Sequence, residues 1–406
     1  MPADVSEQVL AERRHPTYAA CFRCIGPDCE DSCCTEWDIP VDRVTYERYG
    51  FFPLEKLGRE VAQFVAVESG PQPDALFARL NRASSGACPF LGEDRLCRIQ
   101  ASYGQQLLPT SCSMFPRFLA LVDHQLEGSL SLSCPEAARN VLLDPEFLDR
   151  DGNLSSGEFR TDSIFLPAVH KLADGSEADL IGIRRQLVSA VRDRSRPLRY
   201  RLLCIGSFCQ ELDAACSPSD VQSALERLAR RISAMDEECY GRTDTPLKLK
   251  TVFDLSEARI NEGCGARFEE AFLWFVQGAN NVRDFEFANR EFYAPYFEQH
   301  PYIFENYLLN YMFQNLFPFG RIGSADFIRQ NAWGEYLQIA IQYAWLQALL
   351  VGTAGFFKRA FTSEHVIQVI QSFARATEHY PHVLASFGTY LRVRDLDSLK
   401  GMAALL

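Results

Sequence analysis

The sequence predicts a mainly α-helical protein in which a cysteine-rich, loop-rich, metal-binding N-terminal domain precedes a larger, all-helical domain. Nine of the fourteen cysteines lie between Cys21 and Cys134, in the first third of the chain. Through most of the remainder, apolar residues recur at spacings of three and four, and convincing alternating strands are few. A polar stretch with glycine and serine, residues 149–163, separates the two parts. We therefore place the domains at residues 1–150 and 160–406.

Composition narrows the class of protein. The chain has 406 residues, 47% of them hydrophobic and 23% charged, as in soluble globular proteins of two or three domains. Its net charge of −12 argues against nucleic-acid binding and suits a basic partner, such as a lysine-bearing protein. The start of the chain lacks the pattern of a secretory signal. Residues 336–351 are apolar but contain three glutamines and are too short for a membrane span, so we predict a buried helix and a cytoplasmic protein.

The second part contains a series of predicted helices, each with one apolar stripe. One begins at a possible capping box of Ser219 and Gln222, and another follows Ser363 as a possible cap. The one short strand that we predict covers residues 38–42, DIPVD. The apolar stripes are Val221, Leu225, Leu228, Ile232 and Met235; Phe268, Phe272, Phe275, Val276 and Ala279; Phe304, Leu308, Tyr311 and Asn315; and Val366, Ile370, Phe373 and Ala374.

The cysteines of the first part come in spaced groups. The opening group has the spacing C-x4-C-x3-C-C, and single cysteines follow in the segments CPFL, CRIQ, TSC and SLSCPE. The eight cysteines of these groups are Cys24, Cys29, Cys33, Cys34, Cys88, Cys97, Cys112 and Cys134. The remaining ones stand apart and are expected not to bind metal: Cys21, and the isolated Cys204, Cys209, Cys216, Cys239 and Cys264, which we expect to act as small buried hydrophobic residues.

Metal binding is the interpretation that this density of thiols favours. In a reducing compartment, clustered thiols are typical of metal or catalytic sites rather than of disulfides. Thiolate prefers zinc and iron–sulfur centres, and four thiolates complete one of either, so eight suffice for two centres. Because the neighbours Cys33 and Cys34 point in different directions, they could reach one large cluster through different irons or serve different centres. Chance burial and disulfides are the alternatives.

These segments resemble the flagellin lysine-N-methylase family. The resemblance is carried by FRCIGPDCEDSCCTEW at residues 22–37, by the segments around Cys88, Cys97 and Cys112, and by SLSCPEA at residues 131–137. The cysteine-rich part also resembles the broader CxxCxxCC zinc- or iron-chelating domain family. A later segment, ENYLLNYMFQNLFP, is similar to part of the methylases as well.

The resemblance implies an enzyme that methylates lysine side chains of flagellin in the bacterial cytoplasm. It also implies S-adenosylmethionine as the methyl donor and a cysteine-held metal centre, most readily a 4Fe-4S cluster, with zinc as the alternative. One departure is that Ser113 and Phe115 stand where the family often carries Arg and Tyr. The thiol itself is intact, so the departure puts in doubt only a hydrogen bond near the centre.

Methyl transfer to lysine needs a neutral amine, whereas a free lysine has a pKa near 10.4. A tyrosine-lined pocket or a carboxylate that accepts the proton would supply the neutral form. Residues 305–315 offer such groups on one predicted helix, with two tyrosines on one face and two asparagines on another. The predicted catalytic residues are Tyr307, Tyr311 and Glu305, and the predicted donor-binding residues are Arg98, Arg117, Asn306 and Asn310. An aromatic core helix with polar residues at its edge explains the same pattern.

No familiar fingerprint marks the donor site. A strand–GxGxxG–helix pattern is absent, and residues 261–265, NEGCG, are typical of a helix-ending turn. Two other functions therefore stay open beside the methyltransferase. One is a zinc or iron–sulfur protein that stores metal or carries electrons without methyl transfer, which the large helical part disfavours. The other is an interaction module that zinc merely stabilises.

Overall fold

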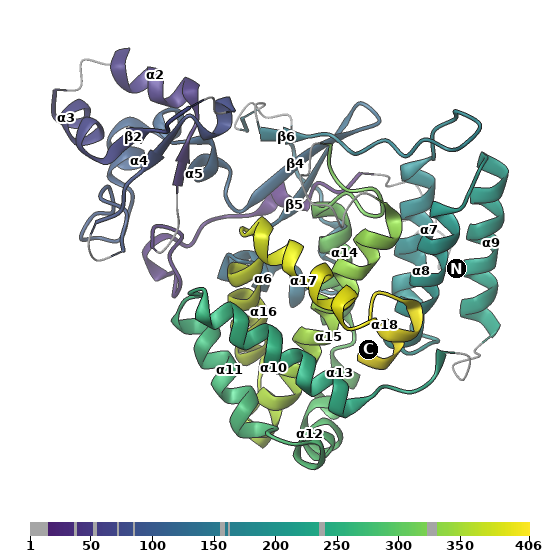
Figure 1. Ribbon diagram of the computed structural model, residues 1–406. Coiled ribbons are helices and arrows are strands. Elements are labelled where there is room, and N and C mark those ends of the chain that lie inside the picture. Colours follow the sequence, from purple (N-terminus) through teal and green to yellow (C-terminus); the bar gives the residue numbers. More distant parts are fainter. Residues whose placement is uncertain are drawn as a thin grey trace, which may run out of the picture.

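The computed structural model describes residues 15–35, 39–51, 55–70, 73–83, 86–154, 159–160, 163–234, 240–322 and 331–406. Trp37, Met235, Cys239 and part of the predicted linker at 149–163 lie outside these residues. The predicted mainly α-helical class is confirmed: a large helical body carries a small lobe that contains short strands (Figure 1).

The small lobe, residues 39–108, lies at the upper left of Figure 1 and is built from short elements. Its three-stranded antiparallel sheet has the order β1-β3-β2 and includes the predicted strand as β1. Within the described ranges of the lobe, twelve buried side chains between Ile39 and Leu108 form its core. The elements here and just beyond are β1 (Ile39–Val41), α2 (Arg43–Phe51), α3 (Glu55–Phe64), β2 (Val65–Val67), β3 (Ala78–Leu80), α4 (Arg98–Tyr103) and α5 (Thr110–Met114).

One carboxylate ties the lobe to the chain that follows it. Asp42 accepts hydrogen bonds from the backbone N–H groups of Thr45 (2.9 Å) and Thr110 (2.8 Å), and Arg160 donates to it at 3.0 Å. Burial acts to raise the pKa of Asp42, but the hydrogen bonds from Thr110 and Thr45 outweigh it and lower the pKa to about 2. Asp42 is therefore ionised and joins helix α2, helix α5 and the linker.

A hairpin that the sequence analysis missed connects the lobe to the body. Strands β4 (Arg117–Val122) and β5 (Gln125–Leu130) pair antiparallel, and β6 (Ile164–Phe165) adds in parallel to β4. Asp123 and His124 form the two-residue turn with φ of 48° and 61°, the left-handed conformation that such tight hairpins require. Because β6 lies beyond residue 160, the prediction of an all-helical second part is wrong at this short strand.

Helix α15 is the centre of the body, in agreement with the predicted buried helix. It packs on α8, α10 and α11, and its Trp345 is fully buried. The α11–α15 crossing is close, since a Cβ on Gly278 would collide with the carbonyl oxygen of Gly352. By length and apolar composition, Ala332–Ala360 could cross a membrane, but 83% of its apolar window is buried inside the protein.

Most predicted helices are present, with small shifts at their first residues. Ser217 rather than Ser219 caps α9, because its hydroxyl accepts from the backbone N–H of Asp220. Thr362 rather than Ser363 caps α16, in a capping box with His365. The helices of the body are α6 (Pro135–Leu142), α7 (Leu180–Arg192), α8 (Leu198–Asp213), α9 (Pro218–Ala234), α10 (Thr245–Asn261), α11 (Ala266–Gly278), α12 (Val282–Ala288), α13 (Ala294–Gln299), α14 (Tyr302–Gln314), α15 (Ala332–Phe357), α16 (Ser363–Thr377), α17 (Pro381–Val393) and α18 (Leu399–Leu405).

The buried core does not split into two parts at the polar linker. The large core runs from Tyr18 through Leu142 to Leu406, so segments before residue 150 share it with the later helices. The division of the chain at residues 150 and 160 stays a prediction.

Candidate functional site

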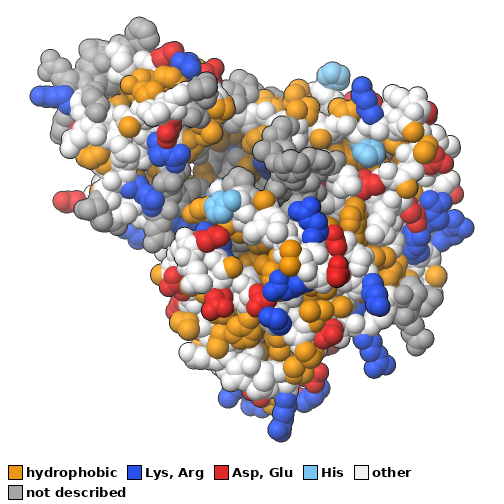
Figure 2. All heavy atoms as spheres, viewed as in Figure 1, with side chains coloured by type: hydrophobic (Ala, Val, Ile, Leu, Met, Phe, Trp, Pro, Cys, Tyr) orange, Lys and Arg blue, Asp and Glu red, His pale blue; other side chains and the backbone are white. Residues whose placement is uncertain are grey.

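A cavity of about 950 Å³ lies where the small lobe meets the helical body, near the hollow visible in Figure 2. Its volume is within the usual range for small-molecule sites. On the body side it is lined by Arg375, His379 and Tyr380 and by the turn between α10 and α11, residues 262–265. On the lobe side its wall carries five of the eight cysteines predicted to bind metal: Cys33, Cys34, Cys88, Cys97 and Cys112.

Four of these thiols form one set, here named the cavity set: Cys34, Cys88, Cys97 and Cys112. The backbone joins two of them, since the N–H of Cys88 donates to the carbonyl of Cys34 at 2.8 Å. Burial and, among other groups, the neighbouring thiols Cys34 and Cys97 raise the pKa of Cys88 to about 11. Burial first, and then the other three thiols, also raise the pKa of Cys112.

The other four thiols form a second set, the loop set: Cys24, Cys29, Cys33 and Cys134. Burial raises the pKa of Cys134 to about 12 against the hydrogen bonds from the first turn of α6, and Cys29 and Cys24 add to the rise. Cys33 lies between the sets: a side-chain hydrogen bond with Cys34 raises its pKa most, burial comes second, and the charges of Cys34, Cys112 and Cys134 add to the rise. The adjacent thiols of Cys33 and Cys34 are hydrogen-bonded to one another and both line the cavity, and their assignment to one centre or to two stays a prediction.

The eight thiols suit zinc or an iron–sulfur cluster in kind and in number. All of them are free, with no disulfide among the cysteines that the structure describes. As they stand, no three Cys, His, Asp or Glu side chains within the described ranges form a ready-made ion site. A soft metal is nevertheless the natural partner of several half-buried or buried thiols that face one another. The metal centre therefore stays a prediction.

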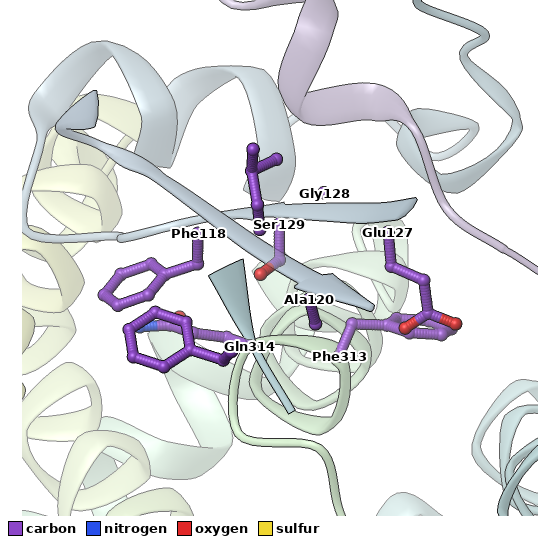
Figure 3. Close-up of a pocket in the computed structure, with 9 residues that line it drawn as sticks. Phe118, Ala120, Glu127, Gly128, Ser129, Phe313 and Gln314 are labelled. Atoms are coloured by element: carbon purple, nitrogen blue, oxygen red, sulfur yellow. The ribbon is translucent and has the colours of Figure 1, made fainter. Parts of the chain in front are cut away.

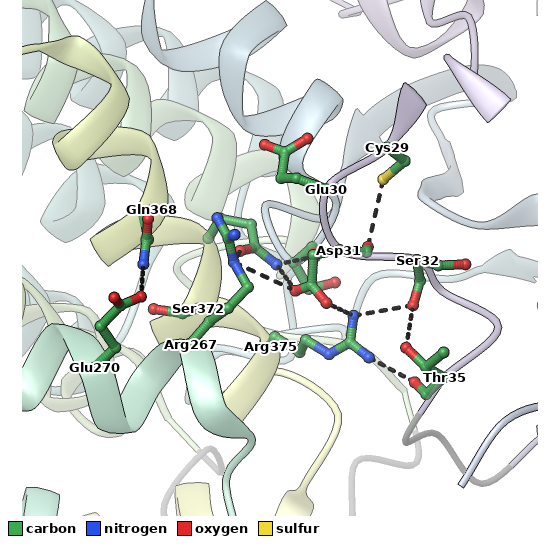
Figure 4. A network of polar contacts seen from close by, with 12 residues as sticks. Cys29, Glu30, Asp31, Ser32, Thr35, Arg267, Glu270, Gln368, Ser372 and Arg375 are labelled. Carbon is green, nitrogen blue, oxygen red and sulfur yellow. Dashed lines mark hydrogen bonds and ion pairs between the residues drawn. The ribbon is translucent and has the colours of Figure 1, made fainter. Parts of the chain in front are cut away.

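Helix α16 holds the cysteine loop in place, as Figure 4 shows. Arg375 donates to the carboxylate of Asp31 at 2.8 Å and to the carbonyl of Thr35 at 2.5 Å. Gln371 donates to Asp31 at 2.7 Å and to the carbonyl of Ser133 at 2.8 Å. This group, here named the α16 latch, fixes the loop that carries Cys29, Cys33 and Cys34 against the segment that carries Cys134.

The polar residues predicted on α14 lie together but face structural partners. Glu305 is buried and forms ion pairs with Arg194 (2.7 Å) and Arg201 (3.0 Å). Asn306 donates to the carbonyls of Val141 and Asp144, both at 2.8 Å. These contacts join α14 to the neighbouring segments, so the structure gives neither residue a place on the cavity wall.

The remaining α14 candidates are also absent from the cavity wall. Tyr307 is buried, and its hydroxyl donates to Gln342 at 3.4 Å, while Tyr311 is buried nearby. Asn310 donates to the carbonyl of Leu130 at 2.8 Å and accepts from Tyr18 at 2.7 Å. These contacts match the alternative of an aromatic core helix, and the catalytic and donor-binding roles of these residues stay predictions.

Arg98 and Arg117, predicted near the donor, lie on the lobe and at its edge. Arg98 donates to the carbonyl of Pro89 at 2.7 Å and pairs with Glu60. Arg117 lies over the ring of Phe22 and donates to the carbonyl of that residue at 3.0 Å. Neither arginine lines the cavity.

The sequence analysis missed two residues beside the cavity, Glu378 and His379. They follow the end of α16 and contact Ser131 and Ser133 through hydrogen bonds. The two serines were visible in the segment SLSCPE, but no pattern connected them to a Glu-His pair 247 residues away.

A second, smaller pocket between the hairpin and α14 is enclosed by Phe118, Glu127, Phe313 and Gln314, among others (Figure 3). Its volume of about 10 Å³ admits about one water molecule. The buried carboxylate of Glu127 pairs with Arg184, whose guanidinium lies over Phe313. This pocket is too small for a substrate, and its ion pair holds β5 to α7.

A protein-family model and several known proteins match parts of this sequence. Residues 184–405 match the model of the FliB lysine N-methylase C-terminal domain. The lysine-N-methylases of Salmonella choleraesuis (strain SC-B67) and Salmonella typhimurium (strain LT2) are 30% identical over 167 residues and 32% identical over 161 residues. Each alignment covers 39% of this chain and 39% of the relative, well under two thirds of its length.

A third relative is covered more fully. The flagellar biosynthetic protein FliU of Salmonella muenchen is 34% identical over 134 residues, which are 32% of this chain and 77% of that protein. No solved structure matches the chain.

Proposed function

Because the chain belongs to the FliB lysine N-methylase family, we propose that it is an S-adenosylmethionine-dependent protein-lysine N-methyltransferase that acts on flagellin. The observation that carries the proposal within the molecule is the cavity between the lobe and the body. It is large enough to take a nucleoside-type donor together with a lysine side chain. The names of the relatives, lysine-N-methylase and flagellar biosynthetic protein, support the reaction and the flagellar substrate.

The proposal includes a metal centre held by the two thiol sets. The cavity set faces the substrate space, and the loop set lies next to it, held by the α16 latch. If three thiols of a set held a four-iron cluster, the fourth iron would stay open and would bind the amino and carboxylate groups of the donor, whereas four thiols would leave no iron open. Zinc in the same sets would instead stabilise the lobe.

The protein must also make the lysine amine reactive. An ammonium group has no lone pair, so the acceptor has to lose a proton before the methyl group is transferred. Enclosure in a largely apolar cavity lowers the pKa of a lysine, and positioning beside the donor replaces a collision in solution by a reaction between aligned groups. Phe115, Leu108 and Ile99 supply apolar wall for this purpose.

The test is a mass measurement on the substrate. We expect protein purified without oxygen, mixed with purified flagellin and S-adenosylmethionine, to increase the flagellin mass by one or more methyl units on lysines. Omission of the donor is the control. A coloured, metal-containing protein that leaves the flagellin mass unchanged would favour the alternative, a metal or electron carrier without methyl transfer.

A further inference from the structure

A row of hydrogen bonds leads from the cavity wall to a carboxylate behind it. His379 lines the cavity, and its Nε2 lies 2.9 Å from the hydroxyl oxygen of Ser133. That oxygen lies 2.6 Å from the hydroxyl of Ser131, which donates to Glu378 Oε2 at 2.6 Å. Of these four residues, His379 alone is part of the cavity wall, so the row has one end at the substrate space and one end inside the protein.

We propose that His379, Ser133, Ser131 and Glu378 form a proton relay that takes a proton from a lysine ammonium group bound in the cavity. This inference rests on the proposed function and names the base that the reaction needs. Each member can accept a proton on one side and pass one on, as imidazole and hydroxyl groups do.

The end of the relay is suited to hold the proton. Glu378 keeps some accessible surface as a residue, but its carboxylate is enclosed by protein atoms, and this burial raises its pKa to about 7 despite hydrogen bonds from Ser131 and Gln314. A carboxylate with this pKa is a much better proton acceptor than an ordinary glutamate, whose pKa lies near 4.3. Burial and the positive charges of Arg375 and Arg321 lower the pKa of His379 to about 4, so the proton does not stay on the imidazole.

The surroundings of the relay contain few other ionisable groups that act on it. Arg321 faces both Glu378 and His379, Arg375 faces His379, and Tyr307 of α14 faces Glu378. Both arginines are cations throughout the neutral range, and burial raises the pKa of Tyr307. Among these groups, Glu378 is therefore the one that changes charge near pH 7.

The proposed step conserves atoms and charge. The ammonium nitrogen loses one proton, which the relay delivers to the Glu378 carboxylate, and the nitrogen gains a lone pair. This lone pair forms the new bond to the methyl carbon of a methylsulfonium donor, whose carbon–sulfur bond breaks and leaves its electron pair on sulfur as a thioether. The product is a methylated ammonium, and Glu378 returns its proton to solvent after the reaction.

Glu378→Gln keeps the size and a hydrogen-bond acceptor for Ser131 but cannot take up the proton. We expect kcat/KM for flagellin to fall at least ~100-fold at pH 7, the usual minimum for loss of a general base. The wild-type rate should fall as the pH drops through about 7, where Glu378 becomes protonated, and this dependence should vanish in the variant. The defect should shrink as the pH approaches the pKa of lysine. Ser131→Ala should produce the same pH-dependent loss.

Glu364→Gln, which changes an exposed carboxylate in the first turn of α16, is the matched control and should leave the rate unchanged. A loss of equal size at every pH in Glu378→Gln would mean a merely structural role and would overturn the relay, as would full activity at pH 7. Infrared titration gives a second readout that needs no turnover. A carboxylic acid band that titrates near pH 7 in the wild type and is missing in Glu378→Gln supports the relay, and its absence contradicts it.

The two proposals fail in different ways. If the wild type methylates flagellin and Glu378→Gln does so equally well, the relay is wrong and the proposed function stands. If the wild type adds no methyl group, both are overturned.

Discussion

The small lobe and the helical body hold their folds by different means. In the body, the long helix α15 is buried among α8, α10 and α11, and one large apolar core joins the body's helices. Among the residues of the lobe that the structure describes, twelve form a buried core, and the strands are three residues long each. A core of this size seldom stabilises ~70 residues without a cross-link or a metal. The comparison teaches that the body can rely on apolar burial, whereas for the lobe we expect metal bound by its thiols to supply the missing stability.

Removal of metal should have the largest effect, and it should be confined to the lobe. Structural metal contributes on the order of 10 kcal/mol to folding in small domains, because the site does not exist in the unfolded chain. We expect chelation to abolish amide protection in residues 39–108 and to leave that of α15 intact, as measured by hydrogen exchange with peptide resolution. Equal protection of the lobe before and after chelation would contradict the difference between the two regions.

Trp345→Ala tests whether apolar burial stabilises the body. The indole is fully buried in α15, and its N–H donates to the hydroxyl of Ser256 at 2.8 Å. We expect a loss of about 3–5 kcal/mol in the free energy of unfolding from the cavity that remains. Phe356→Ala, at a position of the same helix that is 39% exposed, is the control and should cost far less. Denaturant titration measures both, and equal losses would refute this account of the body.

Arg375→Met tests the contact between the two regions. The guanidinium and Asp31 are largely buried, so loss of the guanidinium removes the closer of the two ion pairs of this carboxylate and leaves only Arg267, 3.9 Å away. We expect a loss of about 2–3 kcal/mol in stability and faster release of metal, because the cysteine loop is freed from α16. Arg290→Met removes an exposed arginine that pairs with its neighbour Glu291, and it should change neither quantity. If both variants retain metal equally, the latch does not position the thiols.

Helical periodicity predicted the body well, but it could not reveal the hairpin. Strand β4, RFLALV, reads as a continuous apolar run, and β5 contains the buried Glu127 where an apolar residue would be expected. That charge is compatible with a buried strand because Arg184 of α7 pairs with it, 57 residues later. Local pattern carries no information about such a partner.

The thiols could be found from sequence because their density is a local signal, whereas their division into two sets could not. Cys33 and Cys34 are neighbours in sequence, and only the fold shows that Cys33 lies between the thiols of the cavity set and Cys134 at the start of α6. The tyrosines and asparagines of α14 are residue types that could serve methyl transfer. In the structure they make packing contacts instead, such as the hydrogen bond from Asn310 to the carbonyl of Leu130. Glu378 and His379 gain their role only from tertiary contacts with the segment around Ser131.

The central claim is that two sets of four thiols hold metal beside the cavity. Its most direct test is the content of iron, sulfide and zinc per chain in protein purified without oxygen, compared among the wild type, Cys112→Ser, Cys134→Ser and the control Cys216→Ser, at an exposed cysteine outside the cavity wall. We expect each of the first two variants to lose about half of the metal and the control to lose none. A wild type without bound metal, or a single substitution that removes all of it, would contradict the claim.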